Sequence, residues 1–139
     1  MKVMIIVKAN PDSETGKMPT DKELAEMTSF NEELVKAGVM LDGAGLQPSS
    51  KGARIRFNGK QRQVIDGPFS ETKELIAGFW VLEVKSLAEA LEWGKRIPFQ
   101  EGEVEVRPYH DIADFVDASP ETIARNEKLA QDTEARRRA

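Results

Sequence analysis

Leu75-Ile76-Ala77-Gly78-Phe79-Trp80-Val81-Leu82-Glu83-Val84 is the longest apolar run in this chain. It is rich in residues that favour strands and does not alternate with polar residues. Residues 3 to 7, Val-Met-Ile-Ile-Val, form a shorter run of the same kind. Apolar runs without alternation are typical of strands that are covered on both faces. The two runs therefore predict the central strands of a sheet.

Helices are predicted after each of these strands. Thr20 and Glu23 have the spacing of a capping box, which opens a helix that ends near Gly38. Residues 39–41 then begin a strand that we expect to break at Gly43 and Gly45. Ser86 opens a second helix that ends before Pro98.

Residues 54–66 predict a β-hairpin, because Asn58-Gly59 is a strong signal for a tight turn. A period of two places Ile55, Phe57 and Val64 on one face of this hairpin. Asp66 shares that face if the strand continues to it. Alternatively, the strand has ended and Asp66 caps the turn through its own side chain. The two readings can coexist.

A last strand is predicted over residues 103–108, and Ser119-Pro120-Glu121 opens a last helix. The full order is strand, helix, strand, hairpin, strand, helix, strand, helix. It predicts an α+β fold, with a ferredoxin-like (split βαβ) antiparallel sheet and helices on one face. We divide the chain into an α+β domain, residues 1–110, and a C-terminal helical extension, residues 111–139.

Two helices cover only one face of such a sheet, whereas the central strands have the pattern of strands buried on both faces. A second copy of the same sheet is the simplest cover for the other face. The sequence therefore predicts a homodimer around an enclosed space.

Composition excludes several classes of function. The 139 residues include 20 basic and 24 acidic residues, for a net charge of −4, which argues against a nucleic-acid-binding surface. There is no cysteine for a zinc-thiolate site, and a single histidine excludes a histidine-rich metal site. We predict no cofactor. The first apolar run is too short for a signal peptide or membrane span, so we expect a cytoplasmic protein with no membrane partner.

Asp66-Gly67-Pro68-Phe69, followed by Glu71-Thr72-Lys73-Glu74, resembles the defining motif of the DGPF proteins, a branch of the YCII-related family. The resemblance extends over most of residues 1 to 110 through further segments: Gly38 with Val39-Met40-Leu41, Leu46-Gln47-Pro48, Gly78-Phe79-Trp80, Glu89-Ala90-Leu91-Glu92-Trp93 and Glu105-Val106-Arg107-Pro108. The resemblance implies a dimeric α+β barrel of the ferredoxin-like type.

The resemblance also bears on activity. Many YCII-related proteins carry a histidine in the first helix, proposed to pair with an aspartate. The corresponding place lies near Met27, and the helix here contains no histidine, which departs from the pattern. Distant relatives act on small cyclic or chlorinated aromatic-derived acids by elimination or isomerisation. DGPF genes often stand beside those of extracytoplasmic-function sigma factors.

The residues around the motif supply candidates for a site. Asp66 and Glu71 are the candidate catalytic acid and base, since a carboxylate held near apolar walls gains a useful pKa. Lys73 and Arg107 are candidates for holding negative charge on a substrate. Three aromatic residues are candidate pocket walls: Phe30, Phe69 and Trp80. The competing interpretation is a solvated, salt-linked turn, an Arg107 that holds the dimer, and aromatics that belong to the core.

Two functions follow from these observations. The first is a dimer that binds a small organic acid or similar metabolite between its sheets, with cofactor-free acid/base chemistry of the elimination or isomerisation kind. The alternative is a non-catalytic regulatory or accessory protein associated with sigma-factor transcription control.

Overall fold

A computed structural model describes residues 1–138, apart from the side chain of Lys73. The chain forms two compact units, Met1–Tyr109 and His110–Ala139.

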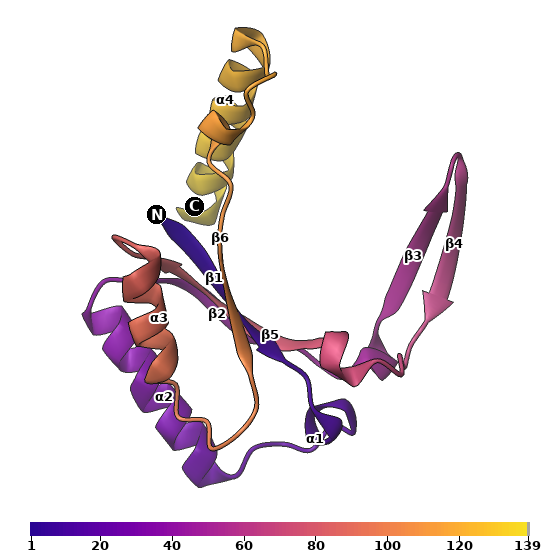
Figure 1. The fold of residues 1–139 in the computed structure, drawn as a ribbon, viewed down its shortest axis with the longest axis vertical. Coiled ribbons are helices and arrows are strands. Elements are labelled where there is room, and N and C mark those ends of the chain that lie inside the picture. Colours follow the sequence, from indigo (N-terminus) through magenta and orange to yellow (C-terminus); the bar gives the residue numbers. More distant parts are fainter. Residues whose placement is uncertain (139) are drawn as a thin grey trace. The chain divides into compact units, whose positions relative to one another are not determined.

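The first unit contains a four-stranded antiparallel sheet with the order β2-β5-β1-β6 (Figure 1). Its strands are β1 (Lys2–Lys8), β2 (Met40–Gly45), β5 (Ile76–Glu83) and β6 (Val104–Pro108). In the register of β1, Ile5 lies opposite Trp80 on one side and Val106 on the other. The two apolar runs thus occupy the centre of the sheet, as the sequence predicts.

Helices α2 (Asp21–Lys36) and α3 (Leu87–Lys95) follow the two central strands and lie on the same face of the sheet (Figure 1). A short helix, α1 (Pro11–Glu14), precedes α2, and two 3-10 turns, η1 (Ser49–Lys51) and η2 (Thr72–Glu74), lie between β2 and β5. This arrangement is the ferredoxin-like α+β fold, and it confirms the predicted fold class.

Both predicted helix starts are confirmed by their caps. The Thr20 hydroxyl accepts a hydrogen bond from the backbone N–H of Glu23 at 3.1 Å, and the Glu23 carboxylate accepts one from the backbone N–H of Thr20. The Ser86 hydroxyl accepts from the N–H of Glu89 at 3.1 Å. These bonds satisfy N–H groups that have no partner within the helix. At the other end of α2, Gly38 has a φ of 75°, which suits the position after a helix end.

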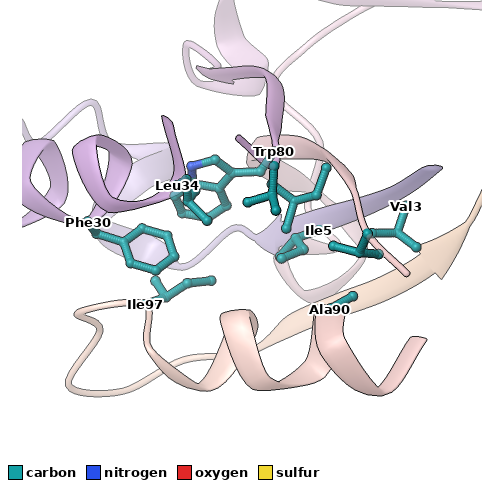
Figure 2. Close-up of a cluster of buried hydrophobic side chains, with 10 residues drawn as sticks. Val3, Ile5, Phe30, Leu34, Trp80, Ala90 and Ile97 are labelled. Atoms are coloured by element: carbon teal, nitrogen blue, oxygen red, sulfur yellow. The ribbon is translucent and has the colours of Figure 1, made fainter. Parts of the chain in front are cut away.

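The hydrophobic core lies between the sheet and the two helices (Figure 2). Leu34 of α2 and Leu82 of β5 are fully buried there. The ring of Phe30 meets that of Trp80 edge to face, with 5.7 Å between the ring centroids. Phe30, a candidate pocket wall, is therefore a core residue that supports Trp80.

Of the two glycines predicted to break strand β2, Gly43 lies within the strand and Gly45 ends it; the strand has an irregularity between Met40 and Asp42. A Cβ atom on Gly43 would lie 2.8 Å from Met40 Cε and 3.1 Å from Trp80 Cδ1. Glycine at this position lets the indole ring lie close against the strand.

The opposite face of the sheet has an apolar centre on β1 and β5 and charged side chains on β6. Since Val3 and Ile5 point into the core, the alternation of β1 directs Met4 and Ile6 to this second face. Ile6 and Val81 of β5 are 9% and 8% exposed, yet they do not belong to the core under the helices. Helices α2 and α3 leave this face uncovered.

Strands β3 (Ala53–Asn58) and β4 (Gln61–Asp66) form a separate two-stranded sheet (Figure 1). We call residues 53–66 the arm. Ile55 lies opposite Val64 and Ala53 opposite Asp66, so Asp66 shares the face of the apolar side chains, as predicted. Both strands consist almost wholly of exposed residues, so this apolar face is not part of the core.

The second unit consists of a 3-10 turn, η3 (Ile112–Asp114), and helix α4 (Pro120–Arg138). The Ser119 hydroxyl accepts a hydrogen bond from the N–H of Thr122 at 3.2 Å, so this helix begins where the sequence predicts. Among residues 1–138 there is no helix long and apolar enough to cross a bilayer.

Candidate functional site

The corner that follows the arm, residues 66–70, packs on the turn at residues 48–52. The Ser49 hydroxyl accepts a hydrogen bond from the N–H of Phe69 at 3.1 Å and donates one to the carboxylate of Glu14. The N–H of Ser49 also donates to Glu14, at 3.0 Å. The N–H of Gly67 donates to the carbonyl of Gly52 at 3.0 Å. These bonds tie the base of the arm to α1.

Two of these bonds lower the pKa of Glu14 below its ordinary value of 4.5, the larger effect coming from the Ser49 hydroxyl and the smaller from its backbone N–H. A lowered pKa in the folded state contributes stability that is present above pH 4.5 and is lost as the pH falls through the folded value. We expect Ser49→Ala to raise the pKa of Glu14 toward 4.5, as measured by NMR titration of its carboxyl carbon.

The neighbouring Ser50→Ala serves as the control, since Ser50 takes no part in these bonds, and it should leave the titration of Glu14 unchanged. An identical Glu14 titration in the native chain and in Ser49→Ala would contradict the assignment.

The predicted site residues of the corner are mainly exposed. Asp66 is exposed at the end of β4, and Glu71 is exposed just before η2. Phe69 is half-buried beneath the guanidinium of Arg54, 3.8 Å from its ring centroid. The side chain of Lys73 lies outside the described part of the chain. The catalytic roles of Asp66 and Glu71 therefore stay predictions.

Arg107 lies on β6 and, as the alternation predicts, points away from the helices. Its Nε lies 3.3 Å from an oxygen of Glu105 in the same chain, and the other oxygen of Glu105 lies 3.5 Å from Lys8 Nζ. Arg107 thus belongs to a row of charges on the second face of the sheet, and the structure does not place it with the corner residues.

A pocket of about 240 Å³ lies between α2 and the sheet. Its walls come from β1, α2, β2, β5 and the segment after α3: Val7, Met27, Asn31, Gly43, Ala44, Gly45, Ala77, Gly78, Phe79, Trp80 and Phe99. Trp80 is the only predicted site residue among them. A cavity of about 150 Å³ is enough to hold benzene, so this pocket has room for one ring with small substituents.

Asn31 supplies the polar side chain of this pocket. Its Oδ1 accepts a hydrogen bond from Trp80 Nε1 at 2.8 Å. Because the indole N–H can only donate, this bond fixes which end of the amide is the oxygen. Within residues 1–138 the amide nitrogen of Asn31 has no hydrogen-bond partner, and it is not fully buried. Two N–H donors are therefore free for a ligand.

Glycine residues shape the strand side of the pocket. Gly45 lies two positions after Gly43 on β2, so both face α2. A Cβ atom on Gly45 would meet no other atom within 4 Å, which shows open space above this position. The bare backbone leaves a flat surface on which a planar ring can lie.

A larger and more open space, about 460 Å³, lies beside the corner and is lined by residues that include Glu14, Ser49 and Lys51. Enclosure and an apolar lining with a few placed polar groups are typical of small-molecule sites. The pocket at Trp80 fits that description better. Within the described residues no group of three or more histidine or acidic side chains is placed to hold a metal ion.

Asn31 was missed by reasoning from the sequence alone. The signal was present, since Asn31 lies one turn after Met27 and beside the buried Phe30 and Leu34. A short amide on the apolar side of a helix needs a hydrogen-bond partner, and a distant tryptophan provides it. Met27, near the place of the family histidine, lines the same pocket.

Comparison with known proteins gives the family. One uncharacterized protein from Rhizobium meliloti (strain 1021) is 31% identical over 96 residues, which cover 67% of this chain and 77% of that protein. A solved structure, 5-chloro-2-hydroxyhydroquinone dehydrochlorinase from Burkholderia phenoliruptrix AC1100 in complex with 2,5-dihydroxybenzoquinone, is 15% identical with a TM-score of 0.47. This match covers 82% of the chain and 98% of the dehydrochlorinase. Residues 1–113 match the YCII-related domain, and the chain therefore belongs to the YCII-related family.

Proposed function

We propose that this protein binds a small organic molecule with one ring in the pocket between α2 and the sheet. The observation that carries the proposal is the combination of a half-open, mainly apolar pocket with the unused amide donors of Asn31. A ligand carbonyl or hydroxyl oxygen would accept from this amide, while its ring lies beside Trp80 in the open space above Gly45.

The charge of the lining restricts the ligand. In the part of the chain that the structure describes, the residues that line the pocket include no lysine, arginine, aspartate or glutamate. Burying an unpaired carboxylate among them would carry a large cost in free energy. The part of the ligand that enters is therefore uncharged. The carboxylate of an organic acid, the ligand class that the sequence favours, would remain at the opening.

We expect Gly45→Leu to abolish ligand binding, because its side chain would extend into the open space above Gly45. A thermal-shift screen with single-ring carbonyl compounds, such as benzamide and benzaldehyde, with benzoate for comparison, provides the measurement. A ligand at 100 times its dissociation constant stabilises the folded state by about 2.7 kcal/mol. Such a shift in melting temperature should appear in the native chain and disappear in Gly45→Leu.

Two further variants make this test specific. Gly45→Ala adds a single carbon atom and should weaken binding much less than Gly45→Leu. Asn31→Asp keeps the shape and can still accept from Trp80 Nε1, but it removes both free donors and should also lose binding. Ligands that stabilise Gly45→Leu as much as the native chain would contradict the proposal.

Catalysis at the corner forms a separate part of the proposal. Asp66 and Glu71 do not line the pocket, so Asp66→Asn should leave binding there unchanged. Loss of turnover by Asp66→Asn with intact binding would support the predicted acid/base role. The alternative role beside sigma-factor transcription control gains no specific support from the geometry.

We also propose the homodimer that the sequence predicts. The second face of the sheet supports it, because Met4 is half-buried there beside the buried Ile6 and Val81, and a facing sheet would remove the rest of this apolar centre from water.

A further inference from the structure

The arm presents an apolar face that is mostly exposed. Ile55, Phe57 and Val64 share this face and are 57%, 67% and 65% exposed. A two-stranded ribbon by itself is marginally stable in water, and contiguous exposed apolar side chains mark interaction sites. The arm therefore has the properties of a segment that is stabilised by a partner.

The charge of the arm indicates the kind of partner. Residues 53–66 include four basic residues and one acidic residue, a net charge of +3. The whole chain carries −4, so the remaining residues carry −7. The rest of a second copy is thus acidic and electrostatically complementary to the arm.

The outer flank of α2 offers a matching surface. Leu24 and Val35 are 55% and 64% exposed, and together with Thr28 they follow the spacing of one helical face. Asp21 and Glu32 lie beside them, three or four residues away along the helix. We call these five residues the α2 flank.

The α2 flank points away from α3. Glu33 forms an ion pair with Arg96, which directly follows α3, and this pair marks the side of α2 that faces α3. At 100° per residue, Leu24 and Val35 lie on the opposite side of the helix.

We propose that the arm of one copy binds the α2 flank of a second copy. The apolar side chains of the arm would meet Leu24 and Val35. Arg62, which shares their face opposite Phe57, and Lys60 at the tip would lie near Asp21 and Glu32. Both surfaces are exposed within a single chain, so the contact is not made internally. By two-fold symmetry each copy would give one arm and receive one. This inference rests on the homodimer proposed above and adds a second contact to it.

Cross-linking tests the contact directly, because the chain has no cysteine of its own. Lys60→Cys marks the tip of the arm and Glu32→Cys marks the α2 flank. An equal mixture of the two variants, treated with a short bismaleimide, should give a product that joins Lys60→Cys to Glu32→Cys. In the matched control, Lys95→Cys on α3 replaces Glu32→Cys, and this mixture should give little product.

Sedimentation provides the energetic test. Phe57→Ser removes an exposed ring from the arm and should weaken self-association by about tenfold, as loss of a buried interface aromatic commonly does. Gln63→Ser is the matched control. Gln63 lies on the other face of the arm, opposite Arg56, so this variant should leave self-association unchanged. Both native side chains are exposed, so we expect both variants to fold.

The possible outcomes separate the two proposals. A native dimer that gives no cross-link, and that Phe57→Ser does not weaken, would overturn the arm contact and leave the homodimer standing. A native chain that stays monomeric at micromolar concentration would overturn both. A monomer whose arm binds a double-stranded oligonucleotide would assign the basic residues to nucleic acid instead.

Discussion

Gly67→Ala should destabilise this protein by about 1–3 kcal/mol or more, the usual cost of forcing extra atoms into a packed site. A Cβ atom at this position would lie 1.9 Å from the carbonyl oxygen of Ser49 and 2.7 Å from its carbonyl carbon. Both are backbone atoms, so no side-chain rotation can relieve the overlap. The corner would have to leave the turn at residues 48–52, and the hydrogen bond from Phe69 to Ser49 would be lost with it.

Urea unfolding followed by tryptophan fluorescence measures this effect. Gly52→Ala is the matched control in the same turn, because its Cβ would lie 3.7 Å from the Ser49 oxygen, an ordinary contact distance. Its φ of −117° also suits alanine. The control should stay within about 0.5 kcal/mol of the native chain. Equal stabilities of the two variants would show that the corner does not pack on Ser49.

Leu34→Ala should cost about 2–5 kcal/mol, the range for removing a large buried aliphatic side chain. Leu34 is fully buried at the point where α2 meets the sheet, in the same cluster as Phe30 and Trp80. The loss combines less apolar burial with the cavity that the missing atoms leave. Because this cluster holds the wall of the ligand pocket, Leu34→Ala should also weaken any ligand bound at Trp80.

Leu129→Ala makes the same chemical change at a position that is 64% exposed in α4. Alanine is also a good helix former, so this control should change the free energy of unfolding by less than about 0.5 kcal/mol. Denaturation curves for the two variants provide the comparison. A loss for Leu34→Ala no larger than that for Leu129→Ala would contradict its place in the core.

The sequence predicted most of the fold, because the decisive signals are local. Capping residues start α2 and α3, and unbroken apolar runs identify the central strands. The position of the pocket could not be predicted in the same way. It depends on Gly45, Asn31 and Trp80, which are far apart in the chain and meet only through the register of β2 and β5 and the packing of α2.

The corner motif shows a second limit of prediction from the sequence. The sequence predicted a catalytic role for its acidic residues, and Asp66 does share a face with apolar side chains, as the alternation predicted. That face, however, belongs to an arm whose side chains are exposed. Periodicity predicts which residues share a face, but it does not reveal what lies opposite that face.

The arm also has an evolutionary consequence. Strands β2 and β5 are neighbours, and the N–H of Leu46 already bonds to the carbonyl of Ala77 at 2.8 Å, so a short loop would suffice to join them. Residues 47–74 therefore behave as an insertion, and among those that the structure describes none lines the pocket at Trp80. Changes in the length or charge of this insertion would leave that pocket intact. On the proposals made above, the arm would determine the partner and the pocket would determine the ligand, in separate parts of one small chain.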